Sequence, residues 1–174
     1  MAEEKQKITA IDLAKEFIMN FEGMRLKSYQ DSGGIWTIGY GHTNNVVPGM
    51  LITKDKAIEF LHQDLADSLQ RLNVQISLNA WETATMLSLA YNLTWKSYKA
   101  LEITLNINKQ AFKDRMLLYC RDAQGNFLKG LKIRRIAERL LFENREWKSF
   151  KEWAQKPTTK LIDIINKEKE LFNK

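Results

Sequence analysis

The sequence predicts an α+β fold that is mostly helical, with one small antiparallel sheet near the N-terminus. Apolar residues recur at helical spacing over most of the 174 residues. Only two short runs, Arg25 to Gln30 and Trp36 to Tyr40, change to a period of two and are rich in aromatic and β-branched residues. With 44% hydrophobic residues and no visible repeat, the chain suits one compact domain, or two lobes that share a long helix.

The first helix is predicted from Thr9 to about Glu22. Its apolar positions are Ile11, Ala14, Ile18 and Phe21. Thr9 with Asp12 resembles a capping box, and Gly23 is a typical C-terminal stop. Glu22 therefore falls on the last turn, where unpaired carbonyls oppose ionisation of a carboxyl group. That dipole contributes only about 0.3–1 kcal/mol, so a general acid at this position would also need partial burial.

The two short strands flank Asp31-Ser32-Gly33-Gly34, which predicts a hairpin whose register matters to chemistry. A two-residue turn at Gly33-Gly34 would put the side chains of Asp31 and Thr37 on opposite faces. A three-residue loop, Gly33 to Ile35 with one glycine in the left-handed region, would pair Asp31 directly with Thr37. We predict the second register, because only it lets both side chains hold one water. A third strand is expected to complete the sheet.

The remainder is predicted to be helical, with starts set by capping residues. Thr53 is a good N-cap for a helix to about Leu72, and Asn79 with Glu82 predicts a capping-box start for an apolar helix over 80–93. The later helices are expected near Tyr98 to Asn106, from Lys109 to Cys120, from about Leu131 until Pro157 ends it, and as an amphipathic stretch after Thr158.

Charge is unevenly distributed. Residues 1–95 carry 8 basic and 11 acidic side chains, net −3, whereas residues 96–174 carry 19 and 10, net +9. A basic half attracts polyanions, which leaves nucleic acid, anionic membrane, anionic wall polymers or simply a solvated basic face. No nucleic-acid recognition motif accompanies it, so we predict no nucleic-acid partner.

Several functional classes are not expected. The single cysteine, Cys120, cannot form an internal disulfide and is predicted to be a small buried apolar residue. No histidine or cysteine cluster has metal-ligand spacing, so we predict no cofactor and no metal. The N-terminal MAEEKQK lacks the apolar core of a secretory signal, and no segment predicts stable membrane insertion. Synthesis in the cytoplasm is the expectation.

The spacing Glu22, eight residues, Asp31, five residues, Thr37, followed by TIGYGHT, resembles the active-site signature of the phage-type lysozymes, the endolysins of glycoside hydrolase family 24. The resemblance extends from Ile8 to about Phe142. It includes Pro48-Gly49-Met50 with Ile52-Thr53, Tyr91-Asn92, and Gly130 to Arg135 with Ala137-Glu138-Arg139.

This resemblance implies a lysozyme-like two-lobed fold with a three-stranded antiparallel sheet. Its catalytic domain would cover residues 1–142: a small lobe over about 21–52, a connecting helix over about 53–72, and a helical lobe over about 79–142 that includes the N-terminal helix. Residues 143–174 exceed the family's usual end and are predicted to be a helical extension packed on the same domain by one apolar stripe.

The implied activity is that of an N-acetylmuramidase, which cleaves the β-1,4 bond between N-acetylmuramic acid and N-acetylglucosamine in peptidoglycan. Glu22 would be the acid, and Asp31 with Thr37 would hold and activate a water, giving inversion. The implied setting is lysis of a bacterial host by a phage or prophage, with a monomer reaching the wall through a separate pore. The alternative is a catalytically inactive wall-binding or virion module.

Supporting residues carry over by position. The resemblance implies that Arg134, or otherwise Arg135, pairs with Glu22. It also implies that His42 forms a salt bridge with Asp64, which would lower the pKa of Asp64.

Gly41 and Asn92 complete the implied set of substrate-binding or supporting residues. The chain departs from the family pattern at Leu93, at Tyr98-Lys99-Ala100-Leu101 and at Tyr119, which puts sugar contacts on that side of the site in doubt.

Overall fold

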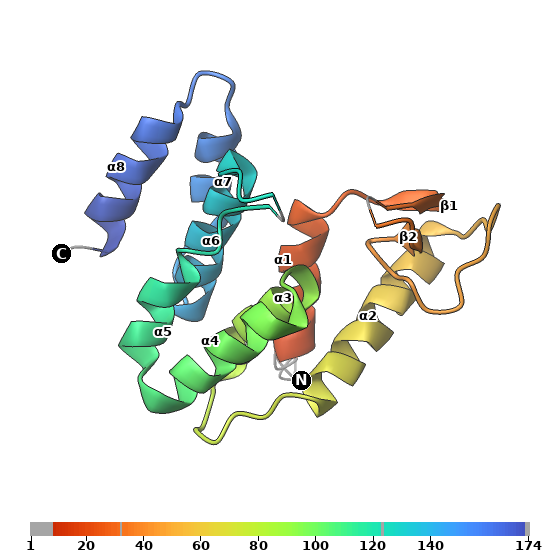
Figure 1. The fold of residues 1–174 in the computed structure, drawn as a ribbon, viewed down its shortest axis with the longest axis horizontal. Helices are drawn as coiled ribbons and strands as arrows, with labels where there is room; N and C mark the ends of the chain where they lie inside the picture. Colours follow the sequence, from red (N-terminus) through yellow and green to blue (C-terminus); the bar gives the residue numbers. More distant parts are fainter. Residues whose placement is uncertain (1–8, 32, 123, 173–174) are drawn as a thin grey trace, which may run out of the picture. The chain divides into compact units, whose positions relative to one another are not determined.

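The computed structural model describes residues 9–31, 33–122 and 124–172, which form helices and one hairpin (Figure 1). The elements run in the order α1 (Ala10–Phe21), β1 (Arg25–Gln30), β2 (Trp36–Gly39), α2 (Lys54–Gln70), α3 (Ala80–Asn92), α4 (Trp95–Ile107), α5 (Lys109–Met116), α6 (Lys129–Phe142), α7 (Lys148–Gln155) and α8 (Leu161–Phe172). They divide into two compact units. The first ends at Asn73 and also takes in Met86–Leu93; the second holds Val74–Thr85 and the chain from Thr94 onward.

In the first unit, α1 and α2 begin where the capping residues predicted. The Thr9 hydroxyl accepts a hydrogen bond from the Asp12 N–H at 3.1 Å and donates to the Asp12 carboxylate at 2.6 Å. The Thr53 hydroxyl accepts from the Lys56 N–H at 3.2 Å. Each cap satisfies an N–H that the helix itself leaves unpaired. The apolar faces of the two helices are buried at Ala14, Phe17, Ile18, Ala57, Leu61 and Leu65.

The sheet has two strands in the described residues, so the predicted third strand was wrong. The segment after the hairpin meets β1 through one bridge, between Lys27 and Leu51. Two backbone hydrogen bonds flank it: Ser28 N–H to the Met50 carbonyl and Ile52 N–H to the Leu26 carbonyl, both 2.9 Å. Because Thr53, the residue after Ile52, already caps α2, the segment is too short to continue as a strand.

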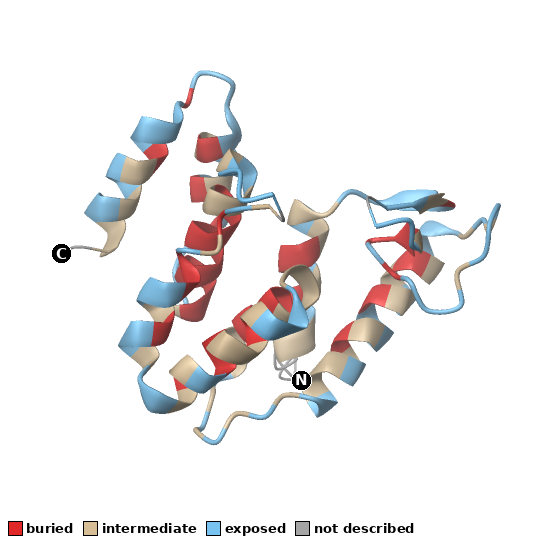
Figure 2. Ribbon diagram, viewed as in Figure 1, coloured by how far each residue is buried: buried red, intermediate tan, exposed pale blue. Residues whose placement is uncertain are grey.

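In the second unit, the predicted capping box at the start of α3 is confirmed. The Asn79 N–H donates to the Glu82 carboxylate and the Glu82 N–H donates to the Asn79 side chain, both at 3.0 Å. Figure 2 shows α6 buried along nearly its whole length, and each residue from Ile133 to Phe142 is buried. Such a helix is the centre of its unit.

The long helix predicted to run until Pro157 is instead two helices. α6 ends at Phe142, and Asn144 takes a left-handed conformation with φ 52°. Asparagine is one of the few residues other than glycine that adopts this conformation readily, and it breaks the helix. α7 and α8 follow and pack against α6. Phe150, Ala154 and Ile164 of these two helices are buried.

The end of α6 carries an ionic cluster that should make the protein sensitive to acid. Burial alone raises the pKa of Glu143, but hydrogen bonds from Arg145 and Lys113, at 2.9 and 3.1 Å, and the charge of Arg139 outweigh it and hold the pKa below the ordinary value of 4.5. A lowered folded-state pKa stabilises the protein above the unfolded value and is lost as pH falls through the folded value.

Glu143→Gln should therefore be less stable than the parent at pH 7, with the difference shrinking as pH falls below about 4.5. Urea unfolding of both proteins at pH 7 and at pH 3 measures this. A difference that stays constant between the two pH values would contradict the assigned ionic role.

Candidate functional site

Glu22 lies immediately after α1, as its C-cap, one residue beyond the predicted last turn. Its N–H donates to the Ile18 carbonyl at 2.8 Å, and its backbone is extended, with φ −91° and ψ 140°. The chain therefore leaves the helix at Glu22, before Gly23. The Glu22 side chain is half-buried. The Glu22 carboxyl group is thus held at the C-terminal end of α1 in a half-buried position.

The hairpin loop closes one residue earlier in the chain than predicted. Thr37 lies opposite Tyr29, and the Asp31 N–H donates to the Ile35 carbonyl at 3.0 Å, so the loop closes between Asp31 and Ile35. The Gly34 N–H donates to the Asp31 carbonyl at 3.0 Å, and Gly34 has φ 77°. The direct pairing of Asp31 with Thr37 was wrong, whereas the left-handed glycine is confirmed.

This register still places Asp31 and Thr37 on one side of the hairpin. Asp31 is two residues beyond Tyr29, the partner of Thr37, and side chains two residues apart share a face. Asp31 and Thr37 are thus diagonal neighbours. The alternative with the two side chains on opposite faces is excluded by the observed pairing.

The peptide groups of Ile35 link Asp31 to Thr37. Asp31 Oδ1 accepts hydrogen bonds from the N–H groups of Ile35 and Gly33, at 2.9 and 2.8 Å. The Thr37 hydroxyl donates to the Ile35 carbonyl at 3.0 Å. Within the described part of the chain, Asp31 Oδ2 accepts no hydrogen bond, and the Thr37 hydroxyl keeps its acceptor lone pairs. Sequence reasoning missed Ile35, because it acts through backbone atoms.

The predicted pair of His42 and Asp64 is present. His42 Nδ1 lies 2.9 Å from both Asp64 oxygens, and the imidazole stacks on Phe60 with ring centroids 4.2 Å apart. The pair ties the turn after β2 to α2. Its predicted effect on Asp64 was wrong: burial raises the pKa of Asp64, and the hydrogen bond from His42, which lowers it, only partly offsets the burial.

Gly41 occupies a position that only glycine fits easily. Its φ is 113°, and an added Cβ would lie 3.4 Å from the Tyr91 hydroxyl. That hydroxyl donates to the Tyr40 carbonyl at 2.9 Å, a hydrogen bond that holds the same turn. Asn92 is the last residue of α3, one residue after Tyr91. The TIGYGHT segment is therefore held by packing on α2 and α3.

Arg134 and Arg135 belong to the second unit, where both bond Glu138. Arg134 Nε lies 3.2 Å from Glu138 Oε1, and Arg135 Nε lies 2.9 Å from Oε2. All three side chains are buried. The pairing of either arginine with Glu22 stays a prediction. Glu138 was not singled out as functional, although its spacing of four and three residues from the arginines is a recognisable helical signal.

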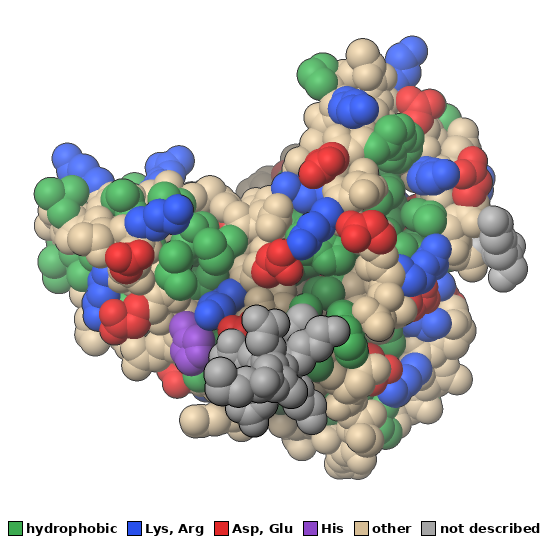
Figure 3. All heavy atoms as spheres, turned by 180° about the vertical axis from the view of Figure 1, so that it is seen from behind, with side chains coloured by type: hydrophobic (Ala, Val, Ile, Leu, Met, Phe, Trp, Pro, Cys, Tyr) green, Lys and Arg blue, Asp and Glu red, His purple; other side chains and the backbone are tan. Residues whose placement is uncertain are grey.

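Other features of the described residues carry no catalytic signature. Cys120 is buried, as predicted, and burial raises the pKa of its thiol, which makes it a poor nucleophile. No group of three or more potential metal-ligating side chains is close enough to hold an ion in the described ranges. None of the described helices combines the length and apolarity of a bilayer span. Figure 3 shows basic and acidic side chains interspersed on one face of the molecule.

Known proteins resemble this chain in sequence and in fold. The phage lysozyme family matches residues 19–138. The endolysin of Salmonella phage P22 is 38% identical over 132 residues, covering 70% of this chain and 88% of the relative. A solved structure of a P22 lysozyme variant has a TM-score of 0.65 at 34% identity, covering 79% of this chain and 99% of that one.

A second solved structure, the muramidase domain of SpmX from Asticaccaulis excentricus, has a TM-score of 0.68 at 26% identity and covers 74% of this chain and 93% of that one. The fold is therefore mostly helical and lysozyme-like. The chain belongs to the phage lysozyme family and is a peptidoglycan-degrading endolysin.

Proposed function

We propose that Glu22, Asp31 and Thr37 carry the lysozyme reaction, the hydrolysis of the β-1,4 bond between N-acetylmuramic acid and N-acetylglucosamine, with inversion at the anomeric carbon. The observation that supports it most is the link through Ile35, which fixes a carboxylate and a hydroxyl on one side of the hairpin. Hydrolysis of a glycosidic bond with inversion needs a carboxylate that activates a water, opposite a proton donor.

The proposed water is held by two acceptors. Since the Thr37 hydroxyl donates to the Ile35 carbonyl, it would accept one proton of the water in a hydrogen bond. Asp31, with Oδ1 fixed by two N–H groups, would accept the other proton through Oδ2. The lone pair of the water oxygen is then directed away from both groups, toward the sugar.

In the proposed reaction, Glu22 gives its proton to the glycosidic oxygen as the bond between that oxygen and the anomeric carbon breaks. The water oxygen forms the new bond from the opposite face, and its proton moves to the Asp31 carboxylate. The site returns to its starting state when Asp31 loses this proton and Glu22 regains one. Inversion requires a carboxyl separation of about 6.5–9.5 Å, wide enough for the water.

The remaining residues are proposed to support this arrangement. His42 with Asp64, and Tyr91 beneath Gly41, would hold the turn after β2, whereas Arg134 would set the charge near Glu22. The proposed place of action is the peptidoglycan of the host, reached after synthesis in the host cytoplasm.

The anomeric configuration of the first product tests inversion. Proton NMR during digestion of soluble glycan fragments should show the α-anomer first, followed by mutarotation, because water attacks opposite the leaving group. An initial β-anomer, or a covalent sugar adduct on Asp31 detected by mass spectrometry, would contradict the proposed role of Asp31. Replacing Asp31 by Asn should abolish the signal, and the fold of that variant is checked by circular dichroism.

A further inference from the structure

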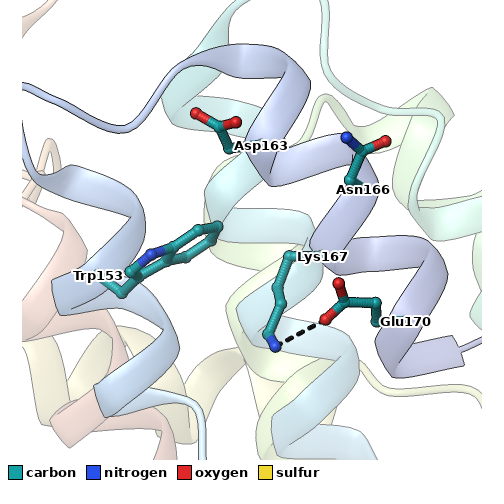
Figure 4. A pocket seen from close by; sticks show the side chains of 5 residues that line it. All are labelled: Trp153, Asp163, Asn166, Lys167 and Glu170. Atoms are coloured by element: carbon teal, nitrogen blue, oxygen red, sulfur yellow. Dashed lines mark hydrogen bonds and ion pairs between the residues drawn. The ribbon is translucent and has the colours of Figure 1, made fainter.

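The helices that follow the family match carry a hollow of their own. It has a volume of about 410 Å³ and is lined by Trp153 of α7 and by Asp163, Asn166, Lys167 and Glu170 of α8 (Figure 4). This volume lies within the range of ligand pockets, roughly 300–1,000 Å³. All five residues lie beyond residue 138, where the family match ends. We propose that this hollow binds a neutral N-acetylated sugar of the wall glycan, as a site additional to the catalytic one.

The lining combines one aromatic surface with groups that can bond an amide. Trp153 is half-buried and presents its indole toward α8 (Figure 4). A large aromatic ring packs against the apolar face of a sugar and still offers an N–H donor. Within the described residues, neither the indole N–H of Trp153 nor the side-chain amide of Asn166 is used in a hydrogen bond. An asparagine amide both donates and accepts, as an acetamido group requires.

Two hydrogen bonds and one ion pair connect residues around the hollow. The Thr159 hydroxyl donates to the Trp153 carbonyl at 2.8 Å, and Lys129 Nζ donates to the Thr159 carbonyl. Lys167 Nζ lies 2.8 Å from Glu170 Oε2 on the next turn of α8.

The charge of the lining decides the class of ligand. It holds two carboxylates, Asp163 and Glu170, and one ammonium group, that of Lys167. Although residues 96–174 carry a net charge of +9, a phosphate polymer or an anionic lipid would meet net negative charge here. A wholly apolar ligand would cover four polar side chains. A neutral ring with one apolar face and an acetamido group fits both constraints.

A second glycan contact would act on wall binding more than on bond cleavage. Two sites on one chain that bind the same polymer raise its effective concentration, provided that the polymer spans both. Cleavage of a short soluble fragment that occupies only the catalytic site should not change. Wall binding and fragment cleavage therefore distinguish a second glycan site from a role in bond cleavage.

The experiment measures cosedimentation of the full chain with purified insoluble peptidoglycan. A Glu22→Gln background keeps the glycan uncut, and Asn166→Ala and Trp153→Ala are compared with Gln155→Ala, an exposed amide at the end of α7 outside the hollow. We expect Asn166→Ala to weaken binding about fivefold, the effect of one ordinary hydrogen bond. Trp153→Ala should weaken it about tenfold or more, and Gln155→Ala should match the background.

Two further measurements test whether the variant is folded and which ligand the hollow binds. With Glu22 intact, Asn166→Ala should cleave short soluble fragments at the parental rate, which confirms that the variant is folded. Chitotriose, a neutral trimer of N-acetylglucosamine, should shift the indole N–H resonance of Trp153 and the amide resonance of Asn166. Unchanged wall binding by both variants, no shift with chitotriose, or shifts only with peptide-stem fragments would each overturn the proposal.

Discussion

Glu22→Gln is expected to lower the rate of wall lysis by about 10²- to 10⁴-fold, the usual contribution of a general acid. Glutamine has nearly the shape of glutamic acid but no acidic proton, so the leaving sugar oxygen would depart unprotonated. Because Glu22 is a C-cap whose helical hydrogen bond uses its backbone N–H, the substitution should leave α1 intact. Loss of turbidity of a bacterial wall suspension measures the rate.

The matched control is Glu59→Gln, which changes an exposed carboxylate of α2 that pairs with Lys56. Exposed pairs of this kind contribute little, so this variant should lyse walls like the parent and unfold at the same temperature. If Glu22→Gln lysed walls at the parental rate, Glu22 would not be the general acid. Lysis by neither the parent nor the variant, with wall binding intact in both, would favour the alternative of an inactive wall-binding module.

The elements that the sequence predicted best are those whose determinants are local. Thr9, Thr53 and the pair Asn79–Glu82 each cap a helix through residues three positions apart, and all three caps form as expected. The pairing of His42 with Asp64 is not local. It was found through a family resemblance, and no spacing rule would have indicated it.

The failures each have a physical reason beyond local sequence. Two adjacent glycines, Gly33 and Gly34, could both adopt positive φ, so the sequence left the closing residue of the hairpin loop open. The pKa of Asp64 moves opposite to the prediction, because burial competes with the ion pair and burial depends on the folded chain. The break between α6 and α7 at Asn144 depends on one left-handed residue in a sequence that otherwise continues a helical pattern.

Replacing Glu138 should have the largest effect on stability. Its carboxylate is fully buried and is the shared partner of Arg134 and Arg135, whose side chains are also buried. Its carbonyl accepts a hydrogen bond from the Thr85 hydroxyl at 3.3 Å, which places the residue at the junction of α3 and α6. Glu138→Ala would leave two guanidinium groups in the core without this counter-charge, at a cost of about 3–5 kcal/mol.

Two further variants separate charge from packing. Glu138→Gln keeps the side-chain volume but loses the charge. If the ion pairs determine stability, it should be nearly as destabilised as Glu138→Ala. If the side-chain volume determines stability, it should be much closer to the parent. Glu152→Ala, at an exposed position of α7, should stay within about 0.5 kcal/mol of the parent. Urea unfolding at pH 7 measures all three. A loss of less than about 1 kcal/mol for Glu138→Ala would mean that water reaches the arginines and that the cluster is not the electrostatic centre of α6.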